Sequence, residues 1–154
     1  MNLNFTEIMN YLEKNRFSES YARKYFSLFK KVSQIINEEN ILFFYPKFLF
    51  VNDKPIQLYF ILKNHMLINV SIKEDKQMIV EFLNVKNNIR KINYQCSLDD
   101  YGGTTILTVL FEDNFAEIVF NSEEDSNENW KYDFEKVLCD IAKYFINISD
   151  FEHK

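Results

Sequence analysis

The sequence predicts an α+β protein in which a helical extension, an antiparallel meander of seven strands and a final helix follow one another. At both ends of the chain, apolar residues recur every three or four positions, which is typical of amphipathic helices. Between these ends the interval changes to two, and short polar turns separate the runs, which is typical of antiparallel strands. With 154 residues the chain is long enough to bury a core of its own, and we expect one domain over residues 1–154.

Residues 4–39 are predicted to form a helical extension of two helices. Asn4 followed by Glu7 resembles a capping arrangement at the start of the first helix. We expect a break at residues 14–16, after which Ser18 begins the second helix. Its apolar stripe has helical spacing and is wide, as expected for a helix packed on a core. The stripe consists of Tyr21, Tyr25, Leu28, Val32 and Ile36.

Residues 41–122 alternate between apolar and polar side chains and are predicted to form the strands. Pro46 has no amide hydrogen to donate, so the first strand is expected at a sheet edge or a bulge. The predicted strands lie at 41–51, 56–62, 66–72, 78–83, 89–96, 104–111 and 115–121.

An acidic loop at residues 122–129 leads into the last predicted helix, residues 130–148. A sheet with one apolar face needs a cover, and the helices at both ends of the chain supply it. The apolar face of this last helix has the cleanest helical spacing in the chain. It consists of Trp130, Phe134, Val137, Leu138, Ile141, Tyr144, Phe145 and Ile148.

Seven short strands followed by one amphipathic helix form a pattern that resembles bacterial pleckstrin-homology-like (PH-like) barrel domains. The runs IRKI at 89–92, LTVLF at 107–111 and EIVF at 117–120, ahead of the helix at Trp130, support this resemblance, which covers residues 41–148. It implies a strongly bent, seven-stranded PH-like barrel whose C-terminal helix plugs one open end. It also permits a role in docking peptides or proteins. A helix-grip cavity fold and a secretion-chaperone-like α+β fold are competing architectures.

The resemblance departs from the lipid-binding members of that family, which carry a basic cluster between the first two strands. Here that connection offers Lys54, with Lys47 nearby, and little other positive charge. We therefore do not expect phosphoinositide binding.

The composition points to an AT-rich bacterial genome or mobile element, because Phe, Tyr, Asn, Lys and Ile are abundant while Gly and Pro occur twice each. The 18 basic and 23 acidic residues give a net charge of −5, which argues against general nucleic-acid binding. The N-terminus lacks the basic and apolar regions of an export signal, and no apolar run is long enough to span a membrane. We expect a cytoplasmic location.

The sequence contains no recognisable catalytic, cofactor or metal-binding motif. A nucleophile needs an adjacent base, and the one pairing the strands allow is Cys96 with His65. We interpret Cys96 as a small core residue, and we expect Cys96 and Cys139 to be free, buried thiols. The chain is therefore expected not to be an enzyme and to use no cofactor or metal.

The uneven distribution of charge is the one sequence feature that indicates a function. Nine acidic residues and one basic residue lie between positions 112 and 135, whereas the second predicted helix is basic. The leading hypothesis is a non-catalytic protein-interaction module with a partner of unknown identity and basic character. The alternatives are a small-ligand or lipid-binding cavity protein and a toxin-immunity or phage-derived protein. The proposed partner-binding residues are Glu123, Glu124, Asp125 and Glu128, next to Trp130.

Overall fold

The computed structural model describes residues 3–74, 76–99, 103–112 and 117–149, and within them it contains three α-helices and seven β-strands. The helices are α1 (Phe5–Asn15), α2 (Ser20–Ser33) and α3 (Lys131–Ile148), and a 3-10 turn covers Glu38–Asn40. The strands are β1 (Ile41–Lys47), β2 (Gln57–Leu62), β3 (Met66–Ile72), β4 (Met78–Asn84), β5 (Ile89–Gln95), β6 (Ile106–Phe111) and β7 (Ile118–Asn121).

The strands form two antiparallel sheets, and within each sheet the strands lie side by side in sequence order. Sheet A has the order β1-β2-β3-β4 and sheet B the order β5-β6-β7. The predicted α+β class, antiparallel strands and C-terminal helix are therefore confirmed. The single seven-stranded barrel is not confirmed, because both sheets are open and no ladder joins them in the described residues.

The connection between β4 and β5 explains the division into two sheets. The amide of Val85 donates to the carbonyl of His65, and Asn87 has a left-handed backbone with φ of 72°. The Asn84 side chain accepts from the amide of Lys86. The Val85 bond extends the β3–β4 pairing by one residue, and the left-handed turn at Asn87 then leads into β5, which pairs with β6 in a new sheet.

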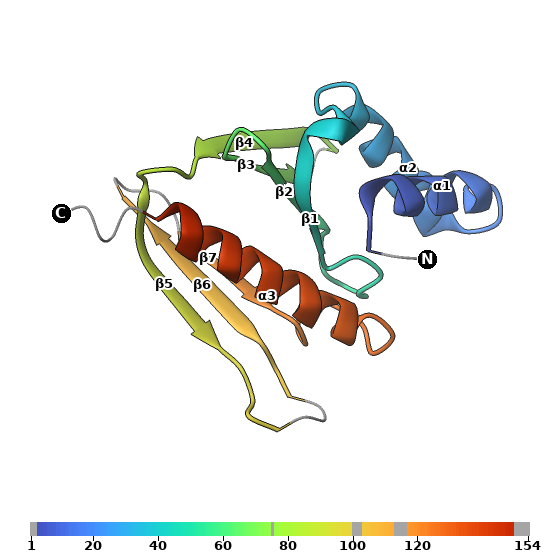
Figure 1. Cartoon of the computed structure of the whole chain (residues 1–154). Coiled ribbons are helices and arrows are strands. Elements are labelled where there is room, and N and C mark those ends of the chain that lie inside the picture. The colour runs from blue at the N-terminus through green and yellow to red at the C-terminus, as the bar shows by residue number, and fades with distance from the viewer. Residues whose placement is uncertain (1–2, 75, 100–102, 113–116, 150–154) are drawn as a thin grey trace.

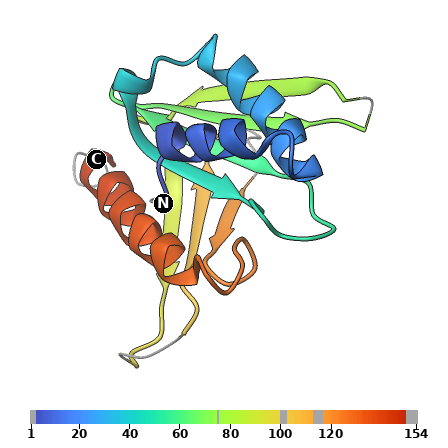
Figure 2. The same cartoon turned by 90° about the vertical axis from the view of Figure 1, so that its right-hand side faces the viewer.

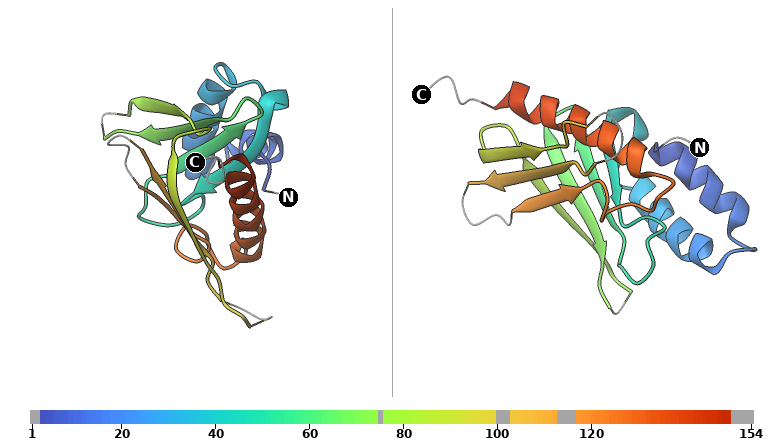
Figure 3. Two further views of the ribbon diagram at one scale, coloured as in Figure 1. Left: turned by 60° about the vertical axis from the view of Figure 1, so that its left-hand side comes forward. Right: turned by 90° about the horizontal axis from the view of Figure 1, so that it is seen from below.

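Sheet A is the middle layer of the molecule. Helices α1 and α2 cover one of its faces, while α3 and sheet B lie on the other side (Figure 1). In the views from the side and from below, α3 runs beside sheet B and near the edge strand β1 (Figures 2 and 3). This arrangement buries both faces of sheet A, each against a different set of residues.

The core between sheet A and the two N-terminal helices is aromatic. The Phe5 and Phe29 rings stack with centroids 5.1 Å apart, and Phe44 and Phe60 pack against Phe5 from β1 and β2. The core between sheet A, sheet B and α3 uses the alternate strand residues. Its fully buried members include Tyr45, Leu107, Phe120, Phe134 and Leu138.

The element ends differ from the prediction in several places. Helix α2 ends at Ser33, short of the predicted 39, and β6 begins at Ile106 rather than 104. Strand β1 ends at Lys47, because Phe48 and Phe50 adopt left-handed φ values of 67° and 58° that interrupt the ladder. The break between α1 and α2 lies at residues 16–19 rather than 14–16. Strand β7 begins at Ile118, and predicted strand positions 115 and 116 lie outside the described residues. Pro46 lies in an edge strand, as expected.

Candidate functional site

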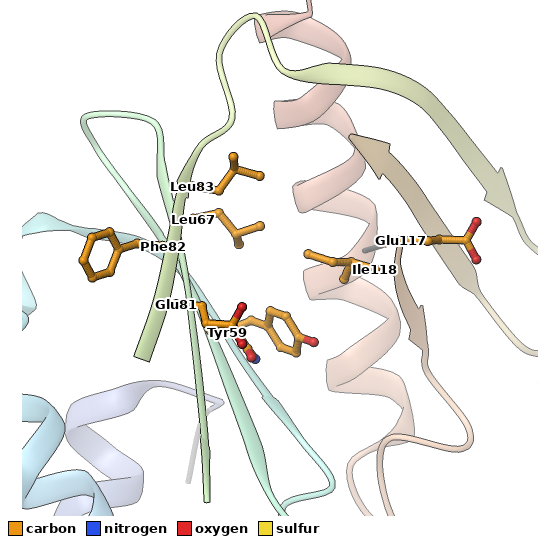
Figure 4. Close-up of a pocket in the computed structure, with 8 residues that line it drawn as sticks. Tyr59, Leu67, Glu81, Phe82, Leu83, Glu117 and Ile118 are labelled. Carbon is orange, nitrogen blue, oxygen red and sulfur yellow. The ribbon is translucent and has the colours of Figure 1, made fainter. Parts of the chain in front are cut away.

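A cleft of about 160 Å³ opens between sheet A and the start of β7 (Figure 4). Figure 4 shows the side chains of Phe82 and Glu117, at its border, pointing away from it. The side chains that form its walls come from four strands. They are Tyr59 of β2, Leu67 and Asn69 of β3, Glu81 and Leu83 of β4, and Ile118 of β7.

Strand register produces the two halves of this cleft. Tyr59 pairs with Asn69, and Asn69 pairs with Glu81, so a polar row crosses sheet A from β2 to β4. The next row on the same face is apolar, because Leu67 pairs with Leu83. Side chains directly opposite on neighbouring strands lie on the same face. One end of the cleft is therefore polar and the other aliphatic.

Two side chains at the polar end, those of Asn69 and Glu81, have polar atoms without a partner among the described residues. The Nδ2 atom of Asn69 is buried and makes no hydrogen bond. The exposed carboxylate of Glu81 has no cation within 4.0 Å among the described residues. The Tyr59 hydroxyl donates to Oε1 of Gln57 at 3.1 Å. A buried donor without an acceptor is costly, so an unpartnered amide in a cleft indicates a place for a ligand.

The carboxylates of Glu81 and Asp125 both act on the Tyr59 hydroxyl at the polar end of the cleft. Burial, together with the negative charges of Asp125 and Glu81, raises the pKa of Tyr59 to about 12. The Tyr59 hydroxyl is therefore a neutral donor at physiological pH. Negative charges that oppose ionisation of Tyr59 would stabilise a cation placed beside it.

Asp125 acts on Tyr59 through its charge and joins the loop before α3 to sheet A. Its side chain is 2% exposed and accepts from the Tyr45 hydroxyl at 2.6 Å and the Asn121 amide at 2.7 Å. Lys47 Nζ lies 3.7 Å from its Oδ1. Burial raises the pKa of the Asp125 carboxyl, an effect that outweighs the lowering by Tyr45, Asn121 and Lys47. Asp125 is therefore a buried structural carboxylate.

The structure separates Asp125 from the other residues that were predicted to bind a partner. Glu123, Glu124 and Glu128 are exposed, and Trp130 is partly buried at the start of α3. The Asn121 side chain accepts from the amides of Glu123 and Glu124 at 3.0 Å each. The Thr104 hydroxyl also donates to Oε2 of Glu123 at 2.6 Å, so hydrogen bonds fix Glu123 and Glu124 on the loop. Among the described residues, none of the three glutamates has an ion-pair partner.

Sequence reasoning missed Tyr59, Asn69 and Glu81. Each occupies a position of the strand alternation where a polar residue is expected to face solvent, so none of them stood out. The one sequence signal for this site was a polar or tyrosine residue at a similar position in three successive strands. The strand register is needed to show that these three residues form one row.

The other chemically interesting side chains are separate from the cleft. Cys96 is free and exposed rather than buried, because it follows the end of β5, and Cys139 is free and partly buried. His65 Nδ1 lies 2.6 Å from the Tyr144 hydroxyl, which links the β2–β3 turn to α3. Within the described part of the chain, no group of three or more potential metal-binding side chains occurs, and no helix has the length and apolarity to cross a membrane.

The fold and the site define a class of protein: an α+β protein of two open antiparallel sheets with a small, half-polar cleft between them. The family model described as "Protein of unknown function (DUF3908)" matches residues 4–136, which include every wall residue of the cleft. Because this match covers more than half of the chain, the protein belongs to that family. No curated protein and no solved structure matches the chain.

Proposed function

We propose that the protein is a non-catalytic interaction module that binds a basic segment of a partner protein in the cleft between the sheets. One observation carries this proposal: the unpartnered Nδ2 atom of Asn69 lies beside the unpaired carboxylate of Glu81 in the same cleft. A ligand that satisfies both must bring a hydrogen-bond acceptor and a cation. A peptide with a lysine or arginine has both, in its backbone carbonyl and its side chain.

The size of the cleft favours a protein partner over the small-ligand or lipid alternative. Pockets for small molecules usually measure about 300–1,000 Å³. The cleft here measures about 160 Å³, which suits a single inserted side chain. Its aliphatic end, formed by Leu67, Leu83 and Ile118, would contact the methylene stem of such a side chain while its charged end reaches Glu81.

The acidic loop extends the same proposal to the approach of the partner. Glu123, Glu124 and Glu128 are exposed and have no ion-pair partner in the described residues. Charges of this kind mainly increase the rate at which an oppositely charged partner arrives. In this proposal the three glutamates attract the basic partner, and the cleft recognises its lysine or arginine side chain.

The relationship to PH-like barrels is also part of this proposal. It is supported by the meander order of seven strands followed by a helix that packs against both sheets. A bacterial source, inferred from composition, and a cytoplasmic location, inferred from the N-terminal sequence and the length of the apolar runs, fit the same proposal.

Nuclear magnetic resonance provides a direct test. The probe is Nα-acetyl-lysine methylamide, and the matched control is its norleucine analogue, which lacks the ammonium group. We expect the lysine compound to shift the Asn69 side-chain NH₂ signals with millimolar affinity, and the norleucine compound to bind at least about tenfold more weakly, as expected for loss of one charge-assisted contact. Equal shifts with both compounds, or none with either, would contradict the proposal.

Variants of the chain separate the roles of cleft and loop. E81Q should lose the preference for lysine over norleucine, whereas E124Q, a matched change on the acidic loop, should keep it. Once the partner is isolated, a pull-down can test the loop. Reversing the charges of Glu123, Glu124 and Glu128 by substitution with lysine should weaken partner binding mainly at low salt. Unchanged binding in that triple variant would remove the acidic loop from the proposal.

A further inference from the structure

The exposed side of α2 forms a basic face. Arg23, Lys24, Lys30 and Lys31 are exposed and recur at helical spacing, while the opposite side of the helix is buried against sheet A. Helix α2 contains no acidic residue, and none of these four cations has an ion pair among the described residues. Four positive charges are thus concentrated on one side of a protein whose net charge is −5.

Helix stability explains only half of this face. Lys30 and Lys31 lie in the last turn, where the helix dipole favours positive charge. Arg23 and Lys24 lie nearer the N-terminal end, where the dipole does not favour them. The N-cap residue Glu19 makes no side-chain capping bond that would offset this. These two cations therefore need another explanation.

An exposed apolar side chain stands near each end of the basic face. Phe17, in the turn between α1 and α2, is 87% exposed, and Ile35, just after α2, is 56% exposed. The Arg16 guanidinium lies over the Phe17 ring, 4.8 Å from its centroid, and it is ion-paired with Glu13 at 3.8 Å, so Arg16 is not counted among the free cations of this face. Neither Phe17 nor Ile35 contributes to the buried core.

We propose that the α2 face docks the protein onto an anionic lipid bilayer. Basic side chains are attracted to negatively charged headgroups, and each one near the surface strengthens binding several-fold. Exposed apolar side chains gain by entering the interface beside the headgroups. A nucleic acid would also attract the cations, but it would offer Ile35 no apolar environment. The combination of unpaired cations and two apolar anchors therefore favours the bilayer.

This orientation leaves the proposed partner site accessible. Helix α2 lies at the upper end of the molecule in Figure 2, and the cleft lies on the opposite face of sheet A. The loop that carries Glu123, Glu124 and Glu128 precedes α3, which packs on that opposite side as well. Docking through α2 is independent of peptide binding in the cleft, so either proposal can fail without the other.

Vesicle co-sedimentation tests the proposal on the full-length protein. The probes are vesicles of phosphatidylcholine with about 30% phosphatidylserine and vesicles of phosphatidylcholine alone. The wild type should bind only the anionic vesicles at about 0.1 M salt and dissociate at about 0.5 M, because screening shortens the reach of the charges. R23E/K24E should lower the partition coefficient at least about thirtyfold, as expected for two surface cations.

A matched control guards against a general effect of charge. R90E/K91E makes the same change at two exposed positions of β5 and should leave vesicle binding unchanged. F17S should weaken binding about tenfold through the loss of one partly inserted apolar side chain. Circular dichroism and thermal unfolding of each variant check that it is folded.

Three results would overturn the proposal. They are failure of the wild type to bind anionic vesicles, equal losses in R23E/K24E and R90E/K91E, and tighter binding to a 20-base-pair DNA duplex than to vesicles. The last result would assign the α2 face to nucleic acid instead.

Discussion

The two faces of sheet A differ in chemistry although they belong to the same four strands. The face toward α1 and α2 is apolar throughout its buried part and is built around Phe44 and Phe60. The face toward sheet B and α3 carries the polar row of Tyr59, Asn69 and Glu81, with the Tyr45–Asp125 hydrogen bond beside it. One face serves stability, whereas the other combines a core with a cleft and a buried carboxylate.

This difference shows how one sheet can have two uses. Because strand residues alternate between faces, the side chains of each face can be substituted separately. The predictions below compare the two faces and follow the size of the expected effect.

The largest effect is expected from F60A, on the face toward the helices. Phe60 is fully buried against Phe5 and Phe44, so its removal leaves a cavity in an aromatic cluster. We expect the free energy of unfolding to fall by about 3–5 kcal/mol. Urea denaturation measures it. F82A makes the same chemical change on the same face at a 65% exposed position and should cost less than about 1 kcal/mol. Similar losses in both variants would show that this face is not the main core.

The next effect is expected from D125A, on the face toward sheet B. The substitution removes the acceptor of the Tyr45 hydroxyl and the counter-charge of Lys47, both of which remain largely buried. Loss of one partner from such a network should lower the free energy of unfolding by about 3 kcal/mol. E124A, in the same loop but exposed, is the control and should change stability by less than about 0.5 kcal/mol.

A smaller effect is expected from pH, again through Asp125. Its pKa in the folded protein is raised above 3.8, so the folded state binds this proton more tightly than the unfolded state does. The contribution of this carboxyl to stability therefore decreases as pH rises from about 3.8 through the folded pKa, and it is constant above that. D125N cannot titrate at this position. The difference in unfolding free energy between wild type and D125N should fall over this range, and a difference that rises with pH would contradict the assignment.

The smallest effect, with the opposite sign, is expected from N69L in the cleft. The Asn69 Nδ2 atom is buried without a partner, so a leucine of similar size removes an unsatisfied donor. We expect stability to be unchanged or to increase by up to about 1 kcal/mol, measured by thermal unfolding, while binding of the lysine probe is lost. A clear destabilisation would show that the amide has a structural role.

The element types could be predicted from the sequence because periodicity is local. The intervals of three or four residues in α1, α2 and α3, and of two in the strands, depend only on neighbouring positions. Element ends were harder to predict, since Phe48 and Phe50 look like strand residues and their left-handed backbone becomes visible only in the structure. The sequence pattern also could not predict that the sheets stay open instead of closing into a barrel. That outcome depends on the direction of β5 after the turn at Asn87.

The candidate site shows the same limit. The acidic loop was visible in the sequence as a run of charges, but Asp125 within that run is buried, while Glu123, Glu124 and Glu128 are exposed. The pattern of charges carries no information about which carboxylate meets Tyr45, since 80 positions separate the two residues.

By itself, the sequence determined the order and type of the elements, their apolar faces and the uneven distribution of charge, since all of these follow from residues near one another in the chain. The tertiary structure alone decided that the strands form two sheets, that Tyr59, Asn69 and Glu81 share one row, and that Asp125 is buried. The physical reason is that register and packing join residues that are distant in sequence, and a cleft exists only between surfaces that folding has brought together.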